Sequence, residues 1–357
     1  MINRLKQLRA MMQDNELESF LVTNPLTIRY LANFTGTTSL LFITSTEQFF
    51  ITDSRYAEQA GDQSLSFEII KMRSSNCWFE DILKIIKSKN IKNVGFETTI
   101  TYLQYLQLKE NLPADVHPIA TTKLVEKIRE IKDEVEIAII TQACAIADAA
   151  FDYILGEIKP GVEEIEIANK LEFFMRNLGA TDLAFDTIVA SGVRSSMPHG
   201  VASEKRIAQG DIVTLDYGCY YKGYVSDMTR TIALGKPDNT LKEIYNIVLE
   251  AQKRAIDTAK PGTLTLDYDK AARSYITQKG YGANFSHGTG HGIGLEVHEG
   301  PDMLKKRKKY LQKNNVITAE PGIYLPDIGG VRIEDDLLIT ADGHRLLTKS
   351  PKELIIL

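Results

Sequence analysis

The sequence predicts two domains, an α/β domain at the N-terminus and an α+β domain with an internal repeat at the C-terminus. First, its 357 residues exceed the roughly 150 residues of an ordinary single domain. Second, helix-like and strand-like runs alternate up to about residue 120, and longer amphipathic helix patterns follow. Third, two segments of the second part resemble each other and carry acids at matched positions.

The first domain alternates helices and strands. Leu5, Leu8 and Met12 recur at helical spacing, and the runs 39–44 and 48–53 read as two strands joined by a polar turn, which predicts a hairpin. In chain order we expect a helix over 5–12, strands over 19–23, 39–44 and 48–53, a helix over 78–86 and a strand over 93–97. These elements form one α/β unit that ends near residue 120.

The second domain begins with helices. Apolar residues recur at intervals of three, four or seven over 123–154, which predicts a long amphipathic helix that is either continuous or broken once. Pro160 and Gly161 end this pattern, and a second helix over 163–178 stops at Gly179. We therefore expect domains at residues 1–122 and 123–357.

Composition argues against several classes of partner. The net charge of −5 speaks against nucleic acid, whose phosphates require a concentrated positive face. No apolar run approaches the roughly 18 residues of a membrane span, and the charged N-terminus is unlike a secretory signal. We expect a cytoplasmic protein in which Cys77, Cys144 and Cys219 are packing residues, because three scattered cysteines make neither a disulfide framework nor a zinc site.

The internal repeat places four carboxylates. The segments 210–218 and 314–322 each run from a turn through a strand-like stretch to an acid, Asp216 in the first and Glu320 in the second. A further strand in each copy carries Asp227 and Glu334, at a spacing that fits a strand–turn–strand hairpin. Acids within strands are costly to bury unless they are paired or bind metal, so we expect two half-domains around one site. The alternative is that these acids point outward from half-exposed sheets.

Four of the six histidines lie close to these hairpins in the sequence: His199, His287, His291 and His298. The stretch 287–294 has a glycine at every second position, which makes a zinc-protease helix implausible, and it does not match a dinucleotide-binding loop. We interpret it as an irregular strand whose missing side chains let a substrate or metal approach the backbone.

This donor set favours metal-assisted hydrolysis. Carboxylates with imidazole and without thiolate suit Mn, Co or Fe, and Zn is possible. Four acids exceed the needs of one ion, whereas two divalent ions about 3.5–4 Å apart would neutralise them and activate a water molecule.

Several motifs resemble those of a known family. From about residue 125 onward the chain resembles the pita-bread metallopeptidases, and the first 120 residues resemble the creatinase-type N-terminal domain of Xaa-Pro aminopeptidases (aminopeptidase P) and Xaa-Pro dipeptidases (prolidases). The resemblance implies an α/β creatinase-type domain followed by an α+β pita-bread domain with a pseudo-two-fold repeat. Its motifs begin at Leu215 (LDYG), Ser226 (SDMTR), His287 (HGTGHGIG), Ala319 (AEPGIY) and Gly330 (GVRIED).

The resemblance also implies a ligand set for two divalent metal ions, with Mn expected and Co, Zn or Fe as alternatives. Asp216 would bind one ion, His291 and Glu320 the other, and Asp227 and Glu334 would bridge them.

Further roles follow from the same resemblance. His199 and His298 would contact the scissile carbonyl, and Glu320 would shuttle the proton. His287 and Arg332 would support these residues, and Tyr324 would line the substrate pocket.

The resemblance implies small peptide substrates with proline at the second position, and a homodimer. Family dipeptidases often carry an Arg shortly after the Val-His-Glu motif, where this chain has Asp302 nearby, and an acid there would repel a substrate carboxylate. We therefore expect an Xaa-Pro aminopeptidase, with an Xaa-Pro dipeptidase as the main alternative. The same architecture also admits a metal-free creatinase-like hydrolase and a non-catalytic binding module. A methionine aminopeptidase is a weaker alternative, since it shares the metal site but normally lacks so large an N-terminal domain.

Overall fold

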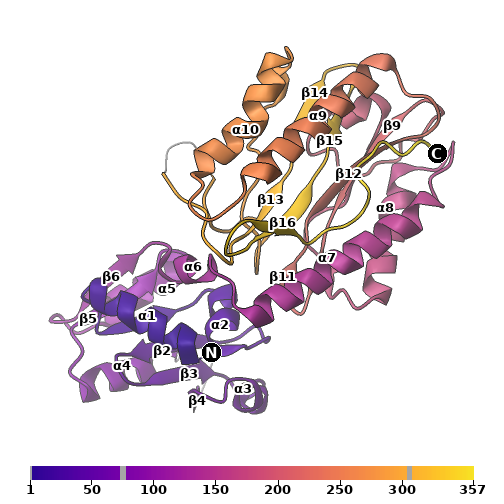
Figure 1. The fold of residues 1–357 in the computed structure, drawn as a ribbon. Helices are drawn as coiled ribbons and strands as arrows, with labels where there is room; N and C mark the ends of the chain where they lie inside the picture. The colour runs from indigo at the N-terminus through magenta and orange to yellow at the C-terminus, as the bar shows by residue number, and fades with distance from the viewer. Residues whose placement is uncertain (1, 73–77, 304–307) are drawn as a thin grey trace. The chain divides into compact units, whose positions relative to one another are not determined.

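The computed structural model describes residues 2–72, 78–303 and 308–357 (Figure 1). The chain divides into two compact units, Met1–Arg129 and Glu130–Leu357. The sequence analysis placed the boundary before residue 123. Helix α6 (Leu124–Arg129) instead belongs to the first unit, because it packs against helices α1 and α2 of that unit.

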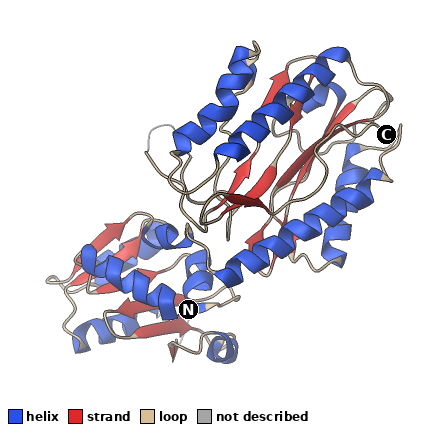
Figure 2. Ribbon diagram, in the orientation of Figure 1, coloured by secondary structure: helices blue, strands red, loops and turns tan. Residues whose placement is uncertain are grey.

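The first unit is built on a six-stranded mixed sheet with the order β4-β3-β2-β1-β5-β6. Figure 2 distinguishes the strands and helices by colour. Strand β1 pairs antiparallel with β2 and parallel with β5, and β2 and β3 form the predicted hairpin. The strands are β1 (Ser19–Val22), β2 (Leu40–Thr44), β3 (Gln48–Thr52), β4 (Glu68–Lys71), β5 (Asn93–Glu97) and β6 (His117–Thr121). The other helices are α1 (Ile2–Asp14), α2 (Pro25–Ala32), α3 (Ala57–Gln63), α4 (Trp78–Ser88) and α5 (Tyr102–Asn111). The α/β architecture expected for this part of the chain is confirmed.

The second unit contains two related halves. The first half has helices α7 (Glu134–Leu155) and α8 (Glu164–Asn177), and the second has α9 (Asn239–Thr258) and α10 (Thr265–Gln278). The helical pattern predicted over 123–154 is broken once, where Asp133 caps the N-terminus of α7 and forms a capping box with Glu136.

Each half carries the predicted pair of antiparallel strands, β9 with β12 and β13 with β16. The expectation of one simple turn within each pair is wrong, because each contains two further strands, β10 and β11 in the first and β14 and β15 in the second. In the first half the strands are β7 (Asp182–Leu183), β8 (Ile188–Ser191), β9 (Ile212–Tyr217), β10 (Cys219–Tyr221), β11 (Tyr224–Val225) and β12 (Met228–Ala233). In the second half they are β13 (Val316–Ala319), β14 (Gly322–Leu325), β15 (Gly329–Arg332), β16 (Asp335–Ile339) and β17 (His344–Leu346). Short 3₁₀ helices lie at Gly192–Ser196 (η1) and Gly282–Asn284 (η2).

Each half has its own apolar core. Helices α7 and α8 pack on the strands of the first half, and α9 and α10 pack on those of the second. Helix α7 is long and apolar enough to cross a membrane, but Ile146, Phe151 and Ile154 are buried in the first core, so it is a core helix here. Cys144 and Cys219 are buried and unpaired, as a packing role requires, and Cys77 lies outside the described residues.

Candidate metal centre

The four repeated acids lie at the ends or edges of the paired strands, two from each half. Asp216 is in β9, directly opposite Thr229 of β12, and Asp227 immediately precedes β12. Glu320 follows β13, and Glu334 lies between β15 and β16. The amide of Glu334 donates to the carbonyl of Thr229 at 3.0 Å, so the two halves are joined where the acids meet.

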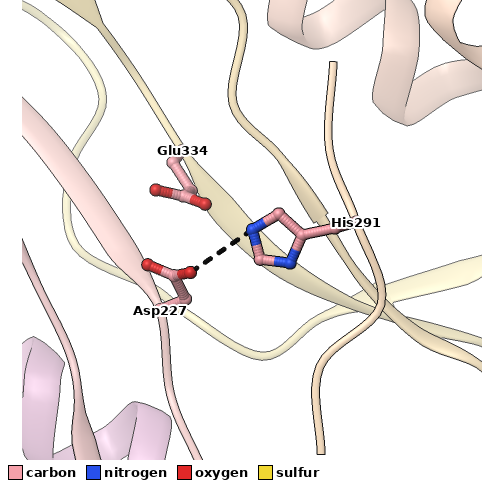
Figure 3. A group of neighbouring side chains, drawn as sticks. All are labelled: Asp227, His291 and Glu334. Carbon is pink, nitrogen blue, oxygen red and sulfur yellow. Dashed lines mark ion pairs between the residues drawn. The ribbon is translucent and has the colours of Figure 1, made fainter. Parts of the chain in front are cut away.

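A compact group forms around His291. Its possible ligand atoms and those of Asp227 and Glu334 lie within 4.8 Å of one another (Figure 3). His291 Nε2 is 3.6 Å from Asp227 Oδ2 and 3.2 Å from Glu320 Oε1, whereas its Nδ1 is 3.2 Å from the carbonyl oxygen of Gly292. A proton on Nδ1 would donate to that carbonyl, which leaves the Nε2 lone pair facing the acids, as metal ligation requires.

Asp216 and Glu334 are each held by only one oxygen. Asp216 Oδ2 accepts from Arg332 at 2.5 Å, and Glu334 Oε2 accepts from the Thr229 hydroxyl at 2.6 Å. Asp216 Oδ1 and Glu334 Oε1 are buried and have no hydrogen-bond partner among the described residues. Buried carboxylate oxygens without donors are costly unless a cation binds them, so this donor set fits divalent metal ions.

The electrostatics of the site reflect this crowding of acids. Burial and the nearby charges of Glu334 and Asp216 raise the pKa of Asp227 well above its usual range, and burial with the charge of Glu320 does the same for Glu334. Burial alone would raise the pKa of Glu320, but the hydrogen bond and the positive charge of a protonated His291 ring lower it to about 2. A bound cation would favour the ionised form of all these acids.

His287, Tyr324 and Arg332 form a connected group beside the acids. The Tyr324 hydroxyl is 2.8 Å from His287 Nε2 and accepts from Arg332 Nη1 at 2.7 Å. His287 Nδ1 lies 3.9 Å from Glu320, and Arg332 binds Asp216. Tyr324 is only 7% exposed, so its hydroxyl is part of this buried network.

The other two histidines of the predicted site, His199 and His298, lie on irregular segments. The His298 ring centroid is 4.1 Å from that of His291. Burial lowers the pKa of His298, and the nearby charges of His291 and His199 lower it further. His199 is exposed, and it lies near enough to His298 for its charge to act on that ring.

The interpretation of the glycine-rich stretch is wrong in one respect. It forms no continuous strand, and its glycines accommodate the protein's own chain. A Cβ at Gly290 would lie 2.1 Å from the carbonyl oxygen of Thr318, and one at Gly292 would lie 2.2 Å from that of Gly300. Close packing against other segments of the same chain therefore requires glycine at these two positions.

The sequence analysis missed residues that hold the ligands. The Thr318 hydroxyl accepts from the His291 amide at 3.1 Å and lies 3.2 Å from Glu320 Oε1. The repeat contains a signal for this residue, because Thr214 occupies the same position in the first copy. Asp336 was also missed: its Oδ2 accepts from the Asp227 amide at 3.0 Å and from Cys144 at 3.2 Å, and burial raises its pKa to about 7.

Comparison with known proteins gives two family matches. Residues 138–341 match metallopeptidase family M24, and residues 4–131 match the Creatinase/Prolidase N-terminal domain.

Relatives and solved structures are similar over nearly the whole chain. A solved Xaa-Pro dipeptidase from Bacillus anthracis is 51% identical with a TM-score of 0.97, covering 100% of this chain and 99% of that one. The Xaa-Pro dipeptidase of Pyrococcus furiosus is 41% identical over 99% of this chain and 100% of its own length. A solved X-Pro aminopeptidase from Thermotoga maritima is 37% identical with a TM-score of 0.89, covering 99% of both chains. The creatinase-type and pita-bread architecture is therefore confirmed.

Proposed function

The chain belongs to metallopeptidase family M24, and we propose that it hydrolyses the bond between an N-terminal residue and a following proline with two divalent metal ions. The observation that carries this proposal is the convergence of acids from both halves on His291, with one oxygen each of Asp216 and Glu334 left without a donor. Asp216, Asp227, His291, Glu320 and Glu334 would hold these ions. Mn is the expected metal, with Co, Zn or Fe as alternatives.

When bound, the ions would lower the pKa of a water molecule and stabilise negative charge on the attacked carbonyl. The protein's own residues then have three tasks. Glu320 takes the proton of the attacking water and passes it to the proline nitrogen, so that the bond breaks into a carboxylate and a secondary amine. His298 and His199 donate to the oxygen of the scissile carbonyl.

The third task is to hold the acids. Arg332 fixes one oxygen of Asp216, and Thr229 fixes one oxygen of Glu334. His287 is connected to Arg332 through the Tyr324 hydroxyl. Groups already oriented in this way need no rearrangement when charge develops during the reaction.

The substrate we propose first is the Xaa-Pro dipeptide. The sequence analysis favoured an aminopeptidase, but the relative at 41% identity and the structure at 51% identity are named Xaa-Pro dipeptidases. Release of the first residue from longer Xaa-Pro peptides is the second candidate, supported by Asp302 and by the similar X-Pro aminopeptidase structure. An X-Pro bond lacks an amide N–H, which removes the backbone donor that general peptidases recognise.

A peptide-length series tests the proposal. Mn-loaded protein is assayed on Xaa-Pro, Xaa-Pro-Xaa and a dipeptide without proline, with Glu320→Gln as the inactive control. We expect the highest kcat/KM for Xaa-Pro, whereas a higher value for Xaa-Pro-Xaa would support the second candidate. No metal-dependent cleavage of either proline peptide would refute both. The homodimer and the cytoplasmic location stay predictions, which analytical ultracentrifugation and cell fractionation would check.

A further inference from the structure

A fully buried ion pair lies beside the loop that carries His298. Lys132 Nζ is 2.7 Å from Glu299 Oε1, and the two side chains are 1% and 4% exposed. The partners are 167 residues apart in the chain and join the connector before α7 to the loop 292–299. A buried pair of charges adds little net stability because the loss of hydration offsets the attraction, but it can fix the relative position of the two segments that it joins.

Glu299 organises the backbone of this loop. Its Oε2 accepts from the amides of Leu295 and Glu296 at 3.1 and 3.4 Å, while its own amide donates to the carbonyl of Gly292 at 2.9 Å. Glu299 thus closes the loop through its side chain and its backbone, and the closed loop includes His298. Because the loop has no regular strand, these bonds take the place of a sheet ladder.

Lys132 is itself fixed to the second half. Its amide donates to the carbonyl of Asn314 at 2.9 Å, and the Asn314 side-chain amide donates back to the carbonyl of Lys132 at 2.9 Å. Asn314 lies two residues before β13, so the backbone of Lys132 is held by the strand region that also carries Glu320. Lys132 therefore fixes the position of Glu299 relative to the strands that carry the metal centre.

His291, at the other end of the same loop, is held separately. Its amide donates to the Thr318 hydroxyl at 3.1 Å, and its carbonyl accepts from the Thr318 amide at 2.8 Å. Loss of the ion pair should therefore move His298 and leave His291 in place.

We propose that the Lys132–Glu299 ion pair is a positioning device that sets the place of His298 relative to His291, and so aligns the donor for the scissile carbonyl. This inference rests on the proposed function only for the claim that His298 donates to the scissile carbonyl. Neither Lys132 nor Glu299 contacts the substrate in this account. They act through the loop.

The experiment compares full-length Lys132→Met with Lys132→Met/Glu299→Gln. The single variant removes the ammonium group that faces a buried carboxylate, whereas the Gln of the double variant carries no charge and still accepts from the Leu295 and Glu296 amides. Lys170→Met is the matched control, since Lys170 pairs with Glu157 at 2.5 Å but is 38% exposed.

Two measurements are made on each protein. For Lys132→Met we expect kcat to fall about 10- to 100-fold, the range typical of groups that orient a functional side chain, while Mn affinity stays within about threefold. Hydrogen exchange should accelerate over 293–299 and stay unchanged over 316–320. The double variant should regain at least about tenfold of the lost kcat, and Lys170→Met should match wild type.

Three outcomes would overturn the inference. One is a folded Lys132→Met protein with kcat near that of wild type. Another is loss of Mn affinity in parallel with kcat, which would indicate collapse of the whole site. The third is hydrogen exchange over 293–299 that does not change. If Lys132→Met does not fold, a double variant that folds without recovering kcat would also overturn the inference. Wild-type protein inactive on every peptide would refute the proposed function, while the exchange data would still decide the role of the ion pair in ordering the loop.

Discussion

Removal of the Arg230 guanidinium should strongly destabilise the second unit, Glu130–Leu357, which we call the catalytic unit. Arg230 is 1% exposed, and its Nη2 lies 2.7 Å from Asp335 Oδ1. It also donates to the backbone carbonyls of Thr229, Glu334, Ser350 and Pro351. One side chain therefore ties the strands of the metal centre to the C-terminal segment.

The size of the effect follows from burial. Breaking a buried ion pair by removing one partner costs about 3–5 kcal/mol. Asp335 keeps Lys352 at 2.7 Å and Gln252 at 2.8 Å, so we expect Arg230→Met to fall near the lower end of that range. For a unit of this size, each kcal/mol lowers Tm by about 2–4 °C, which gives a decrease of about 6–12 °C.

Calorimetry of the full-length protein measures this difference, with the catalytic unit identified as the transition that Mn shifts. Arg176→Met is the control, because Arg176 pairs with Asp182 at 2.9 Å while the two side chains are 47% and 71% exposed. An exposed pair contributes about 0–1 kcal/mol, so its Tm should fall by no more than about 4 °C. Equal Tm decreases in the two variants would refute the reasoning that burial makes the Arg230 pair decisive.

Three further predictions concern the metal centre, the glycine-rich loop and the first unit. Mn added to chelator-treated protein should raise Tm in calorimetry, because Mn at 100 times its Kd stabilises the folded state by about 2.7 kcal/mol. Glu334→Gln should lose most of that increase in Tm. Gly290→Ala should lower Tm and Mn affinity together, because its Cβ would lie 2.1 Å from a backbone oxygen of Thr318; unchanged Mn binding in titration calorimetry would contradict this. Burial raises the pKa of Glu97, so the folded protein favours its protonated form. The stability that this form contributes is complete below the ordinary glutamate pKa and is lost as pH rises through the raised pKa. The Tm of Glu97→Gln minus that of wild type should therefore increase with pH across that window, and a constant difference would show that Glu97 is not the group responsible.

The elements and the repeat could be predicted because their signals are local. The alternation of strands and helices in the first unit and the paired strands β9–β12 and β13–β16 follow from periodicity and turn residues. The inserted strands of each pair could not be predicted, because short runs such as Tyr224–Val225 owe their conformation to pairing with a neighbour.

Part of the candidate site was also visible in the sequence. The repeated positions of Asp216 and Glu320 indicate that two acids share one role, but the run Glu334-Asp335-Asp336 does not show which acid faces the site. In the structure Glu334 belongs to the group around His291, whereas Asp335 is bound by Arg230 and Lys352. Alternation along the chain separates neighbouring side chains, and only the packing on each side decides their roles.

The sequence by itself determined which chemical groups are present and which of them repeat, because backbone preferences and residue types act over a few neighbours. The tertiary structure decided which groups meet. Lys132 binds Glu299, which is 167 residues away in the sequence, and Arg332 binds Asp216, which is 116 residues away. Such contacts are fixed by the packing of the two halves against each other, a property of the whole unit that no short stretch of sequence encodes.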